Sequence, residues 1–284
     1  MSTPALHRFG HEAMATRFEL TLVHSSAAEA ASAAQSVWDD VDQLEQQLSR
    51  FIPHSCISRI NGSEAGRVVD VHEAAMDCLS YGREIWEQTN GAFDVTIGPL
   101  YAVLRWPDGT PRKVTAAELD EARSRCGYHL LDIDPGEFTV TPRANNMQID
   151  LGAIGKGYAL DQAASLLREE HGIANALLNA GTSTVLGIGS MPDKEGWLVR
   201  AGAPEPFALR DEAVSGTGFQ VRGAHVIDPR TAKLVDMRRI IRWAIAPNAT
   251  LADALSTAFM VMNKREISAF CRQYPEVKVI YCED

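Results

Sequence analysis

The segment from Asp150 to Asp161 most constrains how this chain can fold, because it places three glycines just before an amphipathic helical pattern. Residues 146–150 are predicted to form a strand, and Tyr158 to Glu170 a helix. Glycines permit positive φ or a close backbone approach, and the N–H groups at a helix start attract anions. Two interpretations stay open: a phosphate-bearing ligand held here with Lys156 as a second cationic group, or a tight turn that simply requires glycine. The spacing matches neither a Walker A loop nor Gly-x-Gly-x-x-Gly.

The composition is that of an ordinary globular protein. The chain has 284 residues, of which 45% are hydrophobic and 23% charged. This is enough for one large domain with a substantial core, or for two interlocked lobes. The formal net charge of -10 argues against non-specific binding to nucleic acids or anionic membranes, although it does not exclude a local cationic pocket.

The cysteines and the N-terminal sequence indicate the cellular compartment in which the protein is expected. The five cysteines are scattered, with no Cys-x-x-Cys pair, so neither a disulfide framework nor a zinc site is expected. Reduced thiols are typical of cytoplasmic proteins. The first ten residues lack the apolar core of a signal peptide, and no run reaches the ~18 apolar residues of a membrane span. We therefore expect a cytoplasmic protein without a membrane anchor, or an exported one if a leader was trimmed.

Strands are expected singly and in pairs between helices, which favours an α+β fold over a doubly wound sheet. We predict a single large domain over residues 1–284, with a mixed, mostly antiparallel sheet and packed helices in two interlocked lobes. Pro99 should end regular structure in its segment, and Thr250 could cap the last long helix. Helices are predicted at Ala27–Leu48, Glu73–Thr89, Ala116–Arg125, Tyr158–Glu170 and Leu251–Met262. Strands are predicted at Met14–Val23, Tyr128–Asp132, Phe138–Thr141, Ala176–Asn179, Val185–Ile188, Trp197–Arg200, Ala213–Ser215, Arg239–Ala246 and Val277–Tyr281.

Asp253, Ser256 and Thr257 share one face of the last long helix, because positions i, i+3 and i+4 are neighbours on a helix. A carboxylate with hydroxyl oxygens suits a hard cation such as Mg²⁺. The alternative is structural: Asp253 would complement the positive helix N-terminus, and Thr257 would bond the backbone of its own helix.

Two further positions are candidates for chemistry. His225 precedes Val-Ile-Asp228-Pro229 and could act as a general base near neutral pH, or be a structural histidine before a turn. Asp94 follows Gly91-Ala92-Phe93, a loop that could present backbone groups and an aromatic ring to a flat heterocycle, or be a hydrophobic turn.

Taken in order, these segments resemble the ApbE-type FAD:protein FMN transferases, and the resemblance covers nearly the whole chain. No single motif is decisive, but the ordered set is specific. The matching segments are Ala13–Thr16, Ser49–Asn61, Gly91–Leu100, Asp150–Tyr158, His225–Thr231 and Ala252–Ala258.

The resemblance implies Mg²⁺-dependent transfer of FMN from FAD to a Thr or Ser of a target flavoprotein, with release of AMP. Some members instead hydrolyse FAD to FMN and AMP. His225 would be the base that activates the acceptor hydroxyl. Mg²⁺ would be held by the Ala153 carbonyl with Asp253, Thr257 and Ser256. The FAD site would be lined by Met14, Phe51, Ala92, Phe93, Asp94, Asp150, Lys156 and His225.

The chain also departs from the family pattern. Phe51 replaces a usual tyrosine, and Ala15 replaces the glycine of Met-Gly-Thr. Residues 179–183, Asn-Ala-Gly-Thr-Ser, replace the usual Asn-Gly-Gly-Asp, which removes an acidic group beside the site. Ser215-Gly-Thr217-Gly replaces the usual Thr-Ser-Gly run, in which Thr217 keeps a hydroxyl. Two alternatives follow: an FAD pyrophosphatase, and an FAD-binding protein without catalysis.

Overall fold

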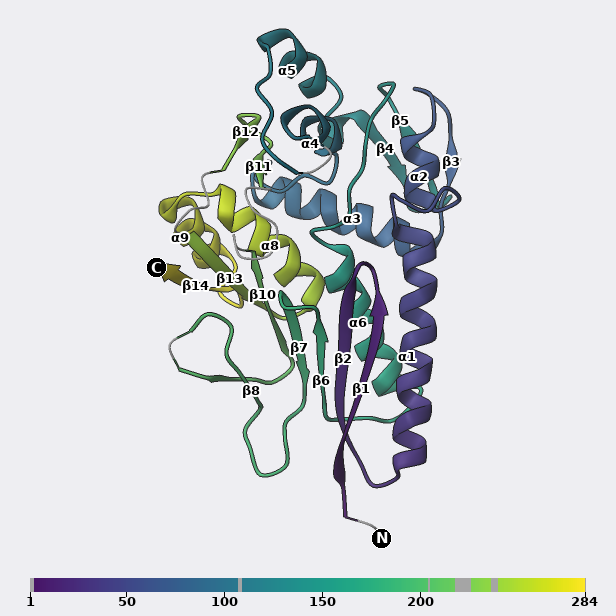
Figure 1. Cartoon of the computed structure of the whole chain (residues 1–284), viewed down its shortest axis with the longest axis vertical. Coiled ribbons are helices and arrows are strands. Elements are labelled where there is room, and N and C mark those ends of the chain that lie inside the picture. The colour runs from purple at the N-terminus through teal and green to yellow at the C-terminus, as the bar shows by residue number, and fades with distance from the viewer. Residues whose placement is uncertain (1–2, 107–108, 204, 218–225, 236–239, 284) are drawn as a thin grey trace.

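The computed structural model describes residues 3–106, 109–203, 205–217, 226–235 and 240–283. Its main sheet has seven strands in the order β1-β2-β6-β7-β10-β13-β14, with neighbouring strands antiparallel (Figure 1). The bounds of these strands are Ala5–Ala13, Thr16–His24, Ala176–Ala180, Thr184–Ile188, Glu212–Thr217, Ile240–Ala246 and Lys278–Glu283.

In the described residues three smaller sheets accompany it, β3-β5-β4, β8-β9 and β11-β12, and their paired strands are also antiparallel. Their strands are β3 Val69–Asp70, β4 Leu131–Asp134, β5 Thr139–Pro142, β8 Trp197–Val199, β9 Phe207–Leu209, β11 Ile227–Asp228 and β12 Lys233–Leu234. The predicted α+β class is confirmed, since helices and antiparallel strands share the described chain. The extent of the domain, residues 1–284, stays a prediction.

The helices fall into two groups in Figure 1. The long helix α1 and helices α6 and α8 lie along the main sheet, whereas α2, α4 and α5 gather with β3-β5-β4 at the other end of the molecule. Their bounds are α1 Ala27–Leu48, α2 Cys56–Asn61, α3 Glu73–Gln88, α4 Gly98–Leu104, α5 Ala116–Arg123, the 3-10 turn Tyr128–Leu130, α6 Gly155–Glu169, α8 Ala249–Val261 and α9 Lys264–Gln273. Among the described residues no helix is long and apolar enough to cross a bilayer.

One face of the main sheet is buried under α1, α6 and α8. The strand register aligns a row across this face, because side chains that point to the same side recur every second residue. Phe18 on β2 pairs with Ala180 on β6, which pairs with Thr184 on β7, and Thr184 pairs with Ser215 on β10. The row begins with an apolar ring and ends with two buried hydroxyl groups. The sheet therefore presents hydroxyls beneath α8.

Helix α1 follows from its sequence. The Ser26 side chain caps it by accepting a hydrogen bond from the Glu29 N–H at 3.3 Å. Its stripe of Val37, Val41 and Leu44 is buried against the core, as the helical spacing predicts. Helices at α3, α5, α6 and α8 are likewise found within a few residues of the predicted bounds.

Four expectations about local structure were wrong. Pro99 does not end regular structure but lies at the start of α4, where its missing N–H costs no hydrogen bond. Residues 146–150 form no assigned strand, although the Asp150 N–H donates to the Val95 carbonyl at 2.8 Å. Tyr128 to Leu130 is a 3-10 turn ahead of β4. Asn248, not Thr250, caps α8, and its side chain accepts from the Leu251 N–H at 2.8 Å.

Candidate active site

The site is built where the first turns of α6 and α8 touch. A Cβ added to Gly157 would lie 2.2 Å from the Ala249 carbonyl oxygen, so only glycine allows this approach. The glycine-rich turn therefore serves helix packing at this position. It also brings Lys156 of α6 beside Asp253 of α8, and the distance from the Lys156 Nζ to the Asp253 Oδ2 is 3.3 Å.

Asp253 is a buried carboxylate with 4% of its surface exposed. Its Oδ2 accepts from Lys156 and from the Gly157 N–H at 3.2 Å. Its Oδ1 accepts from the Thr184 hydroxyl at 3.2 Å and the Ser215 hydroxyl at 3.3 Å. A buried carboxylate costs little when donors surround it in this way. The structural alternative, in which Asp253 complements its own helix N-terminus, does not account for these contacts with α6 and the sheet.

Ser256 and Thr257 extend this cluster along α8. The Thr217 hydroxyl lies 2.8 Å from the Ser256 hydroxyl and 3.4 Å from the Thr257 hydroxyl. Ser256 also donates to the backbone carbonyl of Asp253 at 2.8 Å, a bond within the helix that the structural interpretation had assigned to Thr257. The spacing i, i+3, i+4 thus places a carboxylate and two hydroxyls beside strand β10.

This donor set fits a hard divalent cation. It consists of one buried carboxylate with hydroxyl oxygens, and Mg²⁺ prefers oxygen ligands of this kind, completed by water or phosphate. Ala153, whose carbonyl is the remaining predicted ligand, lies just before α6. Among the described residues, no group of three or more His, Cys, Asp or Glu side chains could hold a metal.

A chain of contacts leads from Asp253 to Asp150. Lys156 donates to the Gly152 carbonyl at 2.9 Å, and the Gly152 N–H donates to Asp150 at 2.9 Å. The Arg50 Nε lies 3.3 Å from the Asp150 Oδ2. The Arg50 guanidinium also stacks 4.6 Å above the ring of Phe51. Phe51 is 79% exposed, so its ring is accessible to a ligand beside Arg50.

Met14 lies in the two-residue turn between β1 and β2, where Ala13 pairs with Thr16. Met14 and Ala15 both have positive φ, 49° and 55°. Such a turn matches the twist of a hairpin but normally contains glycine or asparagine. The replacement of the usual glycine by Ala15 therefore leaves a strained turn. Thr16 lies against Gly181 of the β6–β7 turn, where an added Cβ would approach its hydroxyl to 2.3 Å.

The Ala92–Asp94 segment comes just before Val95, whose carbonyl accepts the hydrogen bond from the Asp150 N–H. Ala92 and Phe93 are buried in the core, with 1% and 2% exposed. The Asp94 Oδ1 accepts from the Thr96 N–H at 2.8 Å and the Thr96 hydroxyl at 2.7 Å. Burial raises the pKa of Asp94 to about 6, and the bonds from Thr96 partly oppose this.

A cavity of about 670 Å³ opens beside Asp94. Trp86, His129, Arg123 and Arg230 are among its lining residues. Its volume is in the range of cavities that hold a small-molecule ligand. Asp94 is thus a buried carboxyl at the wall of a ligand-sized space.

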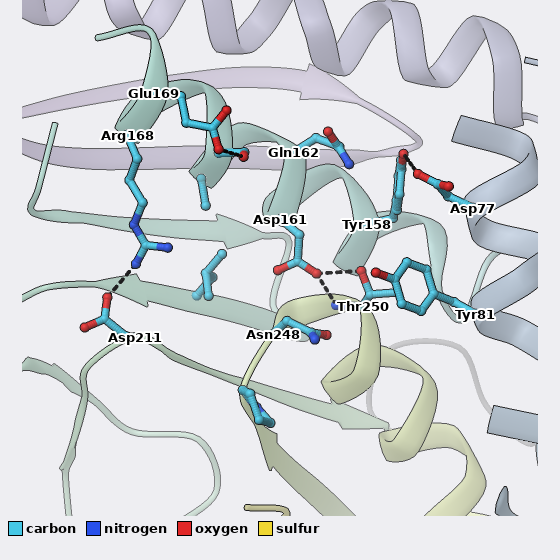
Figure 2. A pocket seen from close by; sticks show the side chains of 14 residues that line it. Asp77, Tyr81, Tyr158, Asp161, Gln162, Arg168, Glu169, Asp211, Asn248 and Thr250 are labelled. Atoms are coloured by element: carbon cyan, nitrogen blue, oxygen red, sulfur yellow. Dashed lines mark hydrogen bonds and ion pairs between the residues drawn. The ribbon is translucent and has the colours of Figure 1, made fainter. Parts of the chain in front are cut away.

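Asp161 was not predicted as a site residue, yet it joins the two helices that carry the site. Its carboxylate accepts from the Ala249 N–H at 2.8 Å, the Thr250 N–H at 2.8 Å and the Thr250 hydroxyl at 2.5 Å. Figure 2 shows Asp161 pointing from α6 to Thr250 within a second cavity of about 290 Å³. Burial raises the pKa of Asp161, while these bonds lower it. The positive N-terminus of α8 is thus complemented by the Asp161 carboxylate of the neighbouring helix α6.

His225, the predicted base, lies outside the described residues. Downstream of it, Asp228 is engaged by Arg230, whose N–H and Nε donate to the Asp228 Oδ1 at 2.9 Å and 3.1 Å. Arg230 also pairs with Glu266 at 2.9 Å. These contacts give Asp228 a structural role in its turn, and both interpretations of His225 stay open.

The structure adds four residues that sequence reasoning did not assign to the site: Arg50, Asp161, Thr184 and Ser215. Thr184 and Ser215 come from strands whose alternation would place them on the buried face, where a hydroxyl is uncommon. A hydroxyl residue at a buried position of a strand was therefore a signal that the sequence offered. No sequence signal pairs Arg50 with Asp150 or Asp161 with Thr250, because these contacts depend on the packing of distant segments.

Comparisons with known proteins show the family and the fold to which this chain is similar. A family model described as the ApbE family matches residues 14–281. The chain is 27% identical over 292 residues to the FAD:protein FMN transferase of Salmonella typhimurium, covering 96% of this chain and 83% of that protein. The fold matches the apo flavinyl transferase ApbE of Pseudomonas stutzeri with a TM-score of 0.87 and 23% identity, covering 99% and 93% of the two chains.

The ApbE protein from Thermotoga maritima has a TM-score of 0.81 and 26% identity, with 98% and 94% of the two chains covered. The family model spans the chain from the β1–β2 turn to the last strand. The chain therefore belongs to the ApbE family.

Proposed function

We propose that this protein transfers FMN from FAD to a Thr or Ser hydroxyl of a target flavoprotein and releases AMP. The observation that carries the proposal is the buried Asp253 carboxylate beside Lys156, ringed by hydroxyls. This arrangement occurs in a chain whose curated relatives bear the name FAD:protein FMN transferase. A diphosphate substrate needs a place where negative charge is neutralised, and this is the described part of the chain best suited to it.

Mg²⁺ would be held by Asp253, Thr257, Ser256 and the Ala153 carbonyl. When bound, it would neutralise charge on the phosphoryl oxygens, which favours the transition state of phosphoryl transfer. The fit rests on oxygen donors around a buried carboxylate, as hard cations require.

The remaining roles belong to residues of this chain. Lys156 would neutralise the diphosphate, and its position in the first turn of α6 adds the helix N-terminus to that attraction. Phe51 and Met14 would contact the flavin, and the Phe51 ring, which is 79% exposed, is accessible to such a ligand. Asp150, Asp94 and the backbone of Ala92 and Phe93 would border the rest of FAD, and for Asp94 its position in the wall of a ligand-sized cavity supports this.

His225 is proposed as the base. The acceptor oxygen would form a bond to the phosphorus of the FMN half, the bond from that phosphorus to the AMP oxygen would break, and the acceptor proton would pass to the imidazole. A histidine suits this step because its ordinary pKa lies near neutral pH.

A second candidate is FAD hydrolysis, in which water replaces the acceptor hydroxyl. Two observations favour it: Phe51 lacks the phenolic hydroxyl usual at its position, and the β6–β7 turn carries hydroxyls where an acid is usual. A third candidate, binding without catalysis, has the same motivation. The scattered cysteines support the cytoplasm as the compartment for any of the three.

The test is incubation of the protein with FAD, MgCl₂ and total protein from its source, followed by denaturing gel fluorescence and mass spectrometry. FMN transfer predicts a fluorescent protein band with FMN bound to a Thr or Ser, and AMP in solution. Asp253→Asn and His225→Ala should abolish both. Free FMN with AMP and no labelled band would identify hydrolysis, and intact bound FAD would identify a binding protein.

A further inference from the structure

The Lys156 ammonium contacts the Asp253 carboxylate, to which a metal cation would also bind. Its ammonium lies 3.3 Å from the Asp253 Oδ2, and Lys156 is 20% exposed at its side chain whereas Asp253 is 5% exposed. Two positive charges on one buried carboxylate repel each other strongly, because the surrounding dielectric is low. A divalent cation and the Lys156 ammonium therefore compete for Asp253.

The backbone cannot relieve this competition. Gly157 packs against Ala249 so closely that a Cβ would lie 2.2 Å from its carbonyl oxygen. Asp161 ties α6 to the N-terminus of α8 by three hydrogen bonds. These contacts flank Lys156 and Asp253, so they oppose a separation of the two helices. The movable part is the Lys156 side chain, whose four methylene groups allow its charge to turn to another partner.

A diphosphate would supply that partner. It carries negative charge, and the Lys156 ammonium lies in the first turn of α6, where anions are attracted. Lys156 would leave Asp253 for the diphosphate and so free the carboxylate oxygen that faces it. The Gly157 N–H and the hydroxyls of Thr184 and Ser215 would stay as donors to Asp253.

We propose that Lys156 is an internal competitor that couples the two ligands: it weakens divalent cation binding until a diphosphate draws its ammonium away from Asp253. The cation and the diphosphate then bind cooperatively, and thermodynamic linkage makes the effect reciprocal. This inference rests on the proposed function for the identity of the diphosphate, but it concerns binding and requires no turnover.

The experiment measures Mn²⁺ binding to the full chain by the loss of the free-ion electron paramagnetic resonance signal, without any nucleotide. Lys156→Met should bind Mn²⁺ about tenfold more tightly than the wild type, because the competing charge is gone. Lys156→Arg should remain near the wild type, since it keeps the charge. Asp253→Asn should abolish binding, which places the ion at this carboxylate.

Lys278→Met is the matched control. Lys278 lies on the edge strand β14 and pairs with Glu212 of β10 at 3.1 Å. Its replacement changes the net charge by the same amount as Lys156→Met, but away from Asp253. Its Mn²⁺ affinity should equal that of the wild type. Circular dichroism and thermal melting of each variant establish that it is folded.

A second measurement separates this proposal from a simple phosphate contact. Metal-free ADP binding, followed by calorimetry, should be weaker in Lys156→Met. Weaker ADP binding with unchanged or weaker Mn²⁺ binding would overturn the proposal, since Lys156 would then only hold phosphate. Mn²⁺ binding that survives Asp253→Asn would also overturn it. An absence of FMN transfer, with the Mn²⁺ results as expected, would overturn only the proposed function.

Discussion

The Asp161 carboxylate on α6 accepts hydrogen bonds from both the backbone N–H and the hydroxyl of Thr250, at 2.8 Å and 2.5 Å, in the first turn of α8. Together with the bond from Ala249, this contact determines where α8 begins relative to α6. Since Lys156 and Asp253 lie on these helices, one carboxylate holds the two halves of the candidate site together.

We expect Asp161→Ala to lower the free energy of unfolding by about 2–4 kcal/mol, because it leaves buried donors at a helix N-terminus without an acceptor. Urea unfolding would measure this. Asp161→Asn keeps one acceptor oxygen and should cost roughly half as much. Asp39→Ala, at an exposed position of α1, should change the stability by less than about 0.5 kcal/mol. Equal stability of the Asp161 and Asp39 variants would contradict the prediction.

Gly157→Ala should disrupt the approach of the two helices. The new Cβ would meet the carbonyl group of Ala249 at 2.2 Å and 2.6 Å from its oxygen and carbon, so α8 must shift. We expect a loss of about 2–4 kcal/mol in stability and weaker Mn²⁺ binding, because overpacking displaces Asp253. Gly155→Ala is the control, since its Cβ would find only Leu151 at 3.8 Å. It should be neutral or stabilising by up to about 1 kcal/mol. Similar behaviour of both variants would count against a packing role for Gly157.

The raised pKa of Asp94 predicts how the stability of the protein depends on pH. Its pKa is raised by burial from 3.8 to about 6, so the unfolded chain ionises this group more readily than the folded one. The free energy of unfolding therefore falls as the pH rises from about 4 to about 6. At 1.36 kcal/mol per pKa unit the loss reaches about 3 kcal/mol above pH 6, and there is no loss below pH 4.

Asp94→Asn removes that penalty and keeps an acceptor oxygen for Thr96. The stability of the variant relative to the wild type should rise between pH 4 and pH 7.5, by about 2–3 kcal/mol. Urea unfolding of both proteins across this range checks it. A difference that does not change with pH would show that burial does not raise the pKa of this carboxyl.

Ala15→Gly should stabilise the protein by about 1 kcal/mol. Ala15 has a φ of 55° in the β1–β2 turn, a conformation that costs a residue with a Cβ about 1–2 kcal/mol and glycine much less. Thermal melting would show a rise of a few degrees. Ala31→Gly, in the exposed interior of α1, should instead lower the stability by about 1 kcal/mol. If both changes destabilised the protein, the turn would not be strained.

Phe51→Ala should weaken FAD binding by about tenfold while leaving stability within about 0.5 kcal/mol, because a ring that is 79% exposed contributes little to folding. Fluorescence titration with FAD and thermal melting give the two values. Phe138→Ala removes another exposed aromatic ring, 43% exposed, in the hairpin between β4 and β5, which contains no residue of the predicted FAD site. It should leave the FAD affinity unchanged. An unchanged affinity in Phe51→Ala would remove this residue from the flavin site.

The sequence by itself determined the features that depend on near neighbours. The periodicity of α1, the face of α8 that carries Asp253 and Ser256, and the glycine-rich start of α6 follow from local spacing. The α+β class also followed, because the order of strands and helices is a property of the chain. The one local error of consequence, at Pro99, arose because proline both ends a helix and begins one.

The tertiary structure alone decided which distant groups meet. Lys156 and Asp253 are 97 positions apart and touch only because Gly157 lets α8 approach α6. Thr184 and Ser215 reach Asp253 because the strand register aligns them across the sheet. Such contacts depend on packing and register, which arise from the whole core at once, so no local pattern contains them.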